Sequence, residues 1–209
     1  AYDSLGNSEI REQLANSAGV FLAAGVPEAE QTQYITSTRA ELAKQITETP
    51  NDVRAHMFYG IFVRSLGLYP EAIGYYEKAL QLSPTKQVIS LEIGLTKLQT
   101  KDYEGALAAF KTAYELEPVY LEARLYYAVA ALYANKETLA NELFAGIDEQ
   151  TLIYDDKVAQ ALAQTGRFNE LTKIFIRRIA EGKDTYENNI SLAVTYLRVG
   201  NRAQSVAVL

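Results

Sequence analysis

Hydrophobic residues recur three or four positions apart along most of the chain, which predicts a succession of α-helices. Glycine, proline and small polar residues separate these periodic segments and mark turns. We expect residues 1–7 to be loose, with Ser8 capping a first helix that ends at Gly25. Pro27 suits the first turn of a second helix. The apolar stripe of that helix comprises Tyr34, Ile35, Thr38, Leu42 and Ile46.

The stretch 53–118 repeats one pattern of residues at an interval of 34. A glycine inside a helix costs about 1 kcal/mol relative to alanine, so a partner helix should cross close to each of the two repeated glycines. We expect the repeated alanines to lie opposite the glycines, and the repeated aromatic residues to pack towards the following repeat. The corresponding positions are Gly60 and Gly94, Ala72 and Ala106, Tyr76 and Phe110, and Pro84 and Pro118.

The interval and the residue types resemble those of the tetratricopeptide repeat (TPR) family. This resemblance covers about residues 53–205. It implies an all-α fold, a right-handed superhelix (α-solenoid) of antiparallel helix hairpins. In such a fold each hairpin buries its apolar face against the next one.

The repeats divide the chain into an N-terminal capping helix pair, residues 1–50, and a TPR array, residues 51–209. After Phe144 the interval shortens to 31, and we expect the superhelix to kink or tighten there. The last repeat is incomplete, so a further helix of the parent protein or a neighbouring chain should cover that end. The repeats are expected at about 53–84, 87–118, 121–147, 152–182 and 186–209.

The composition argues against catalysis and against nucleic-acid binding. The formal net charge is −6 without a run of basic residues, whereas nucleic-acid surfaces are basic. His56 is the only histidine and cysteine is absent, which excludes two-histidine metal motifs and thiol chemistry. The acidic pairs Asp148–Glu149 and Asp155–Asp156 are interpreted as helix starts, where the helix dipole favours them. We expect no catalytic residue, no metal site and no cofactor, and we interpret His56 as a packed helix residue.

The resemblance to TPR proteins implies that the first helix of each repeat lines a concave groove. Two interpretations of this surface stay open. It is an apolar trough for an amphipathic helix or an extended peptide, or its side chains pack on one another and on the chain's own terminal helices. The candidate groove residues are Arg54, Met57, Ile61, Arg64, Leu91, Leu95, Leu98, Glu122, Leu125, Val129, Leu132 and Tyr133.

Two further expectations concern this surface. TPR domains that clamp a C-terminal carboxylate carry Lys, Asn and Arg side chains in the groove, and this chain lacks them. Tyr75 and Tyr126 each precede a tyrosine in core register, so their rings should lie at the surface. The clamp positions hold Met57, Ile61, Glu122 and Tyr126.

A second set of strings is similar to the soluble tail of some bacterial O-antigen ligase-like membrane proteins. The strings lie at 7–14, 67–73 and 82–87. This resemblance implies an accessory domain of a glycan-assembling membrane protein, placed on the outer side of a bacterial membrane, although no apolar run here has the length of a span. The favoured prediction is a non-catalytic scaffold that binds a protein or peptide partner in the apolar groove. The accessory domain is the alternative.

Overall fold

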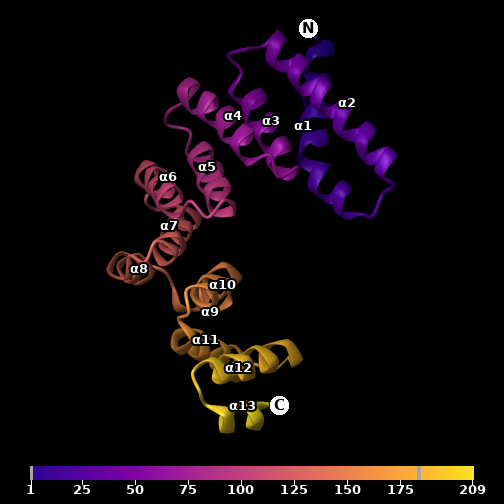
Figure 1. Cartoon of the computed structure of the whole chain (residues 1–209). Coiled ribbons are helices and arrows are strands. Elements are labelled where there is room, and N and C mark those ends of the chain that lie inside the picture. The colour runs from indigo at the N-terminus through magenta and orange to yellow at the C-terminus, as the bar shows by residue number, and fades with distance from the viewer. Residues whose placement is uncertain (1, 183–184) are drawn as a thin grey trace. The chain divides into compact units, whose positions relative to one another are not determined.

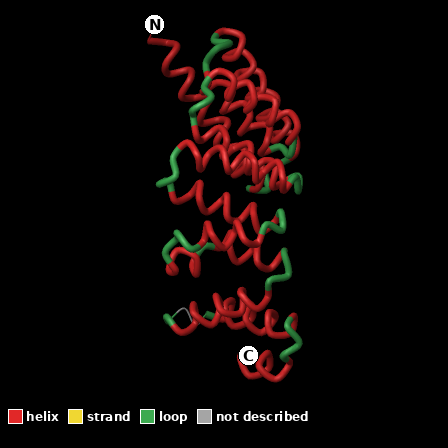
Figure 2. Tube along the Cα trace, turned by 90° about the vertical axis from the view of Figure 1, so that its left-hand side faces the viewer, coloured by secondary structure: helices red, strands yellow, loops and turns green. Residues whose placement is uncertain are grey.

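The computed structural model describes residues 2–182 and 185–209, and only the backbone of residues 2–7. Figure 2 shows helices and connecting loops throughout this part of the chain, with no strand among them. Consecutive helices form antiparallel pairs joined by short turns (Figure 1). The predicted all-α solenoid of helix hairpins is confirmed.

Packing divides the chain into two compact units, Ala1–Glu117 and Pro118–Leu209. The boundary falls inside the predicted array, after its second repeat. The first unit contains α1 (Tyr2–Ala23), α2 (Glu28–Glu48), α3 (Val53–Ser65), α4 (Tyr69–Leu82), α5 (Gln87–Gln99) and α6 (Tyr103–Leu116). The second contains α7 (Leu121–Tyr133), α8 (Glu137–Phe144), α9 (Glu149–Tyr154), α10 (Asp156–Gln164), α11 (Phe168–Ala180), α12 (Tyr186–Arg198) and α13 (Arg202–Val208).

The core of the hairpin α3–α4 depends on contact between a glycine and an aromatic ring. A Cβ atom built on Gly60 would collide with the ring of Tyr76, which is fully buried. Gly94 of α5 and the buried ring of Phe110 in α6 repeat this arrangement. The expectation that alanines lie opposite these glycines stays a prediction, because the atoms nearest to each glycine belong to the aromatic ring. The ring of the second helix occupies the space directly, which allows the two helices to approach closely.

Tyr76 also reaches the following repeat, as the sequence predicted. The Nε atom of Arg64 donates a hydrogen bond of 3.4 Å to the Tyr76 hydroxyl, and Arg64 forms an ion pair of 3.2 Å with Glu92 on α5. Burial raises the pKa of Tyr76 well above its ordinary value, so the hydroxyl remains neutral at physiological pH. A polar group at the end of the aromatic ring thus connects α3, α4 and α5.

The turns inside the five hairpins α3–α4, α5–α6, α7–α8, α10–α11 and α12–α13 each contain one residue in the left-handed conformation. The amide of the residue after it donates to a carbonyl five residues back, which is the Schellman arrangement that ends a helix. Glycine adopts this conformation without steric cost, whereas a residue with a Cβ does not. Three turns use glycine and two do not. The left-handed residues are Gly67, Lys101, Asn135, Gly166 and Gly200.

The N-terminal helix begins earlier than expected. Helix α1 starts at Tyr2, so residues 2–7 are helical rather than loose. Ser8 lies inside this helix, and its hydroxyl accepts a hydrogen bond of 2.8 Å from the Gln45 side chain of α2. Ser8 therefore contacts α2 and does not cap the start of α1. The interpretation of Asp148–Glu149 and Asp155–Asp156 as helix starts is confirmed. Asp148 and Asp155 accept backbone amide hydrogen bonds at the starts of α9 and α10.

The shortened interval after Phe144 corresponds to a short second helix in the third repeat. Helix α8 has 8 residues, against 14 in both α4 and α6. A separate helix of 6 residues, α9, follows it, and the chain breaks again between Tyr154 and Asp156 before α10. The sequence predicted a helix start at Asp148–Glu149 but not that this helix ends after 6 residues.

We predict that Gly94→Ala lowers the free energy of unfolding, because the new methyl group meets the buried ring of Phe110. Overpacking of about 1–3 kcal/mol outweighs the gain of about 1 kcal/mol in helix propensity. Gly74 of α4 is the matched control, since no other side chain lies within 4 Å of the place that a Cβ atom would take there. Gly74→Ala should stabilise by about 1 kcal/mol. Urea unfolding measures both, and equal shifts would contradict the packing argument.

We also predict that Lys101→Gly stabilises the protein, because lysine occupies a left-handed position with φ of 60°. The expected increase in the free energy of unfolding is about 1 kcal/mol. Asn135→Gly, at φ of 56°, should increase it less, because asparagine tolerates this conformation. Thermal and urea unfolding of the two variants provide the comparison. A loss of stability in Lys101→Gly would show that the lysine side chain contributes more than the backbone strain costs.

Candidate functional site

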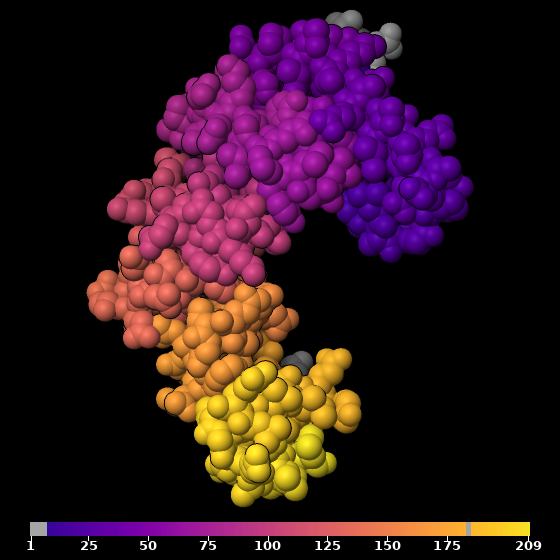
Figure 3. Space-filling model, in the orientation of Figure 1, coloured from indigo at the N-terminus to yellow at the C-terminus, as the bar shows by residue number. Residues whose placement is uncertain are grey.

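The predicted groove begins on α3, where the N-terminal helix of the chain covers it. Helix α1 packs along both α2 and α3. Figure 3 shows this end of the chain, from indigo to purple, as a continuous packed surface. Met57, a predicted groove residue, is buried in one hydrophobic cluster with Ala15 and Ala18 of α1. The small alanine side chains allow α1 to lie close to α3. At Met57, the surface predicted to line a groove is therefore covered by the N-terminal helix α1 of the chain itself.

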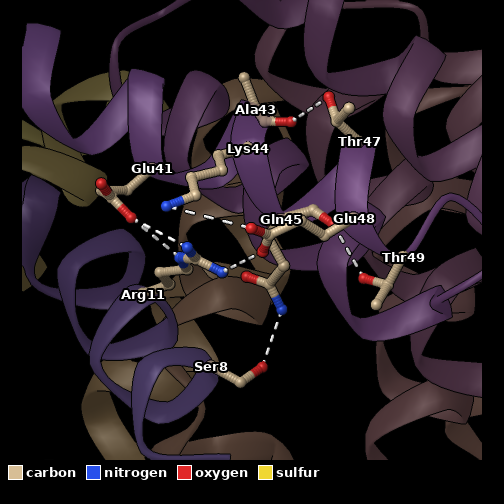
Figure 4. A network of polar contacts seen from close by, with 9 residues as sticks. All are labelled: Ser8, Arg11, Glu41, Ala43, Lys44, Gln45, Thr47, Glu48 and Thr49. Carbon is tan, nitrogen blue, oxygen red and sulfur yellow. Dashed lines mark hydrogen bonds and ion pairs between the residues drawn. The ribbon is translucent and has the colours of Figure 1, made fainter. Parts of the chain in front are cut away.

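Ion pairs fasten α1 at the same place. Glu12 of α1 accepts a hydrogen bond of 2.6 Å from Arg54, the first predicted groove residue. Arg11 is buried, and its guanidinium pairs with Glu41 at 3.0 Å and Glu48 at 3.3 Å on α2 (Figure 4). A buried charge is costly unless it is paired. These two carboxylates therefore fix the rotation of α1 about its axis.

Further along the first unit, the predicted groove is less covered. Ile61 of α3 and Leu95 of α5 occupy equivalent repeat positions and are both half-buried, as is Leu98. Leu91 is buried. Sequence reasoning missed Val88, the α5 counterpart of Arg54, which is 42% exposed. The apolar spacing on α5 could have revealed it.

Arg64 and Glu92 place an ion pair beside these aliphatic side chains. Burial by itself lowers the pKa of Arg64, but the charge of Glu92 and the hydroxyl of Tyr76 raise it, and the net shift is upward. Arg64 is therefore a permanent cation. Sequence reasoning included Arg64 in the groove but not Glu92, although both lie on the first helices of adjacent repeats.

In the second unit, the predicted groove residues on α7 are mostly inside the protein. Leu125, Val129 and Leu132 are buried, and Tyr133 is half-buried. Glu122 is exposed and accepts a hydrogen bond of 2.5 Å from Tyr120. Substitution of Leu132 would consequently test stability rather than binding, because its side chain belongs to the core.

The two tyrosines expected at the surface are both half-buried. The ring of Tyr75 packs edge-on against Tyr59, with ring centroids 4.2 Å apart. The ring of Tyr126 lies under the Lys157 ammonium group, 5.4 Å from it. His56 is buried and its Nε2 atom lies 2.9 Å from the Pro50 carbonyl oxygen. These residues therefore serve packing.

A site that the sequence did not predict lies in the second unit. An open cavity of about 560 Å³ is lined by residues of α8, α9, α10 and α11, together with Leu132 of α7. The lining is largely aliphatic and aromatic, with charged groups at the rim. The shortened repeat interval was the available signal, since it falls on the helices that form this cavity. Its apolar residues are Leu132, Phe144, Leu152, Ile153, Val158, Leu162, Ile174, Ile176 and Ala180.

Comparison with known families agrees with the repeat geometry. A family model described as tetratricopeptide repeat matches residues 32–86 and 91–150. These segments make up more than half of the chain, and the chain belongs to the TPR family. The first match begins within α2, which places that helix in register with the repeats. The family consists of non-catalytic scaffolds that mediate protein interactions.

Individual relatives cover the chain to different extents. Over 127 residues, or 60% of the chain, the sequence is 30% identical to a protein from Haemophilus influenzae named lipoprotein NlpI homolog. The chain spans 40% of the length of that relative. Because this relative is matched over less than half of its length, it does not test the predicted accessory domain of a glycan-assembling membrane protein, and that alternative stays a prediction.

Solved structures share the fold at low sequence identity. A tetratricopeptide repeat protein from Parabacteroides merdae has a TM-score of 0.70 at 18% identity, covering 95% of this chain and 77% of that one. Pseudomonas aeruginosa pilF has a TM-score of 0.60 at 16% identity, covering 97% and 90%. YrrB, described as a TPR protein with an unusual peptide-binding site, has a TM-score of 0.56 at 16% identity, covering 80% and 88%.

The membrane question has one structural answer. Across the residues that the structure describes, no helix combines the length and the apolar character that crossing a bilayer requires.

We predict that Ala18→Leu detaches α1 from α3, because Ala18 is fully buried and the larger side chain cannot be accommodated. Arg11 is the only basic residue before Arg39, and it is buried while α1 is docked. Tryptic cleavage after Arg11 should therefore accelerate several-fold in the variant. Gly19→Ala is the neighbouring control, with open space around its Cβ position, and should not accelerate cleavage. Similar cleavage rates in both variants would rule out tight docking of α1.

Proposed function

We propose that this scaffold binds a peptide of a partner protein along the inner faces of α3 and α5. The observation that carries the proposal is a row of half-buried aliphatic side chains, Ile61, Leu95 and Leu98, beside the exposed Val88. They belong to the first helices of adjacent repeats, and the family mediates protein interactions. An apolar strip of this kind suits a helix or an extended segment with regularly spaced apolar anchors.

Helix α1 supports this proposal, because it already lies on the adjacent surface of α3 as a bound helix would. Its alanines belong to the same buried cluster as Met57, and its Glu12 pairs with Arg54. The equivalent surface of α5 carries Leu91 and Val88 in place of these two groove residues. A partner segment placed there would extend the row of packed helices. The ion pair of Arg64 and Glu92 offers a donor and an acceptor at its edge.

The peptide-binding relative provides a weaker argument. YrrB shares the fold, and its binding site is a property of that protein. At 16% identity, the likeness transfers the helix arrangement but none of the contacting side chains. The proposal therefore depends on the side chains of α3 and α5 themselves.

We predict that Leu95→Asp weakens peptide binding by at least tenfold, because a buried leucine contributes about 1.5–3 kcal/mol. Phage-displayed peptides of random sequence would be selected on the whole chain, and the Kd of the enriched peptides measured by fluorescence anisotropy. Leu116→Asp is the control, since Leu116 is 38% exposed at the end of the second helix, α6. It should leave the Kd unchanged. Equal Kd values in both variants, with both folded by circular dichroism, would refute the proposed site.

A further inference from the structure

The cavity of the second unit lies between the third and fourth repeats, whose interface is less completely packed than that between the first two repeats. Phe144 of α8 occupies the repeat position of Tyr76 and Phe110. Those two rings are fully buried, whereas Phe144 is half-buried and lines the cavity. The same residue type at the same position thus lacks the cover that it has in the first unit.

The missing cover follows from the length of α8. Helices α4 and α6 have 14 residues, and α4 packs along the first helix of the next repeat, α5. Helix α8 stops after 8 residues, so roughly 9 Å of helix is absent at 1.5 Å per residue. Among the described residues, α10 packs mainly against α7, α9 and α11. Phe144, at the end of this short helix, lines the cavity.

Helix α9 forms a wall of this cavity but does not fill it. Arg178 of α11 donates a hydrogen bond of 2.6 Å to the carbonyl of Ile153, and the Tyr154 hydroxyl donates one of 3.0 Å to Glu181. Gln150 donates to the same carboxylate at 3.0 Å. These bonds hold α9 against α11 and keep the two walls fixed. The opening between them is a feature of the folded unit.

We propose that this cavity is a docking site for an amphipathic helix of a partner protein, which completes the seam in place of the missing part of α8. Its volume of about 560 Å³ admits several apolar side chains. Half-buried Phe144, Leu152 and Ile174, together with Ile176 at 45% exposure, present an apolar surface to such a helix. The site is separate from the surface of α3 and α5.

The charges at the rim indicate the polar face of the partner. Arg167 is paired with Glu137 at 2.6 Å, and Arg177 with Glu181 at 2.5 Å. Lys173 of α11 is exposed on the rim and has no ion-pair partner among the described residues. A carboxylate beside the apolar stripe of the incoming helix would meet this lysine. Such a rim contact contributes mainly to the association rate.

The test uses a phage-displayed library of helical peptides with apolar residues at positions i, i+3, i+4 and i+7, selected on the whole chain. Enriched peptides should lose at least tenfold in affinity on Ile176→Asp, measured by fluorescence anisotropy. Ala180→Phe should cause a similar loss by filling the cavity with an apolar ring, which separates blocking from unfolding. Val20→Asp, at a residue of α1 that is 75% exposed, should have no effect. Lys173→Glu should slow association several-fold.

Several results would overturn this inference. Peptides that bind Ile176→Asp and Ala180→Phe as tightly as the parent chain would place them elsewhere. Failure to enrich any helical peptide, combined with binding of a fatty acid or an apolar dye, would identify a small-molecule cavity instead. Self-association that Ile176→Asp abolishes in sedimentation experiments would identify a second copy as the occupant. Leu95→Asp should leave helix binding at the cavity intact, so loss of either site is distinguishable from loss of the other.

Discussion

The hairpins of this chain depend on an aromatic ring that occupies the space of an absent Cβ. The rings of Tyr76 and Phe110 lie against Gly60 and Gly94, and all four residues are buried. The contact brings the two helices of a hairpin together and lets the end of the ring reach the next repeat, as the Tyr76 hydroxyl does with Arg64. Because each ring contributes to two interfaces, stability within a hairpin and between hairpins is coupled.

This constraint explains why the inner surface of the first unit differs along its length. The rings fix the positions of α3 and α5 but do not supply a cover for their inner faces. At α3 the cover is α1, whose small residues Ala15 and Ala18 permit close packing and whose rotation is set by the pairs of Arg11. At α5, Leu91 is buried, whereas Leu95 and Leu98 remain half-buried and Val88 is exposed. Met57 and its repeat counterpart Leu91 are both buried, so the two hairpins differ in the segment that lies against them and not in the burial of this position.

The second unit departs from the pattern for a related reason. There the aromatic residue Phe144 is retained, but α8 ends directly after it. Without the remaining helix turns, its ring has no cover from its own helix, and a short helix held by hydrogen bonds to α11 forms a wall instead. We attribute the apolar cavity beside Phe144 to the short α8, because the aromatic residue is retained while the helix that carries it ends early.

The amino-acid sequence by itself determined the hairpins, their register, the turn positions and the buried aromatic residues. Each of these arises from local periodicity or from a residue type that a single backbone position demands, as Gly67 illustrates with its left-handed φ. Only the tertiary structure decided what covers each surface. The docking of α1 on α3, the role of Ser8 and the wall formed by α9 depend on contacts between segments far apart in sequence, which no repeat interval encodes. For that reason Val129, which occupies the repeat position of Leu95, became core, while Leu95 remained half-buried.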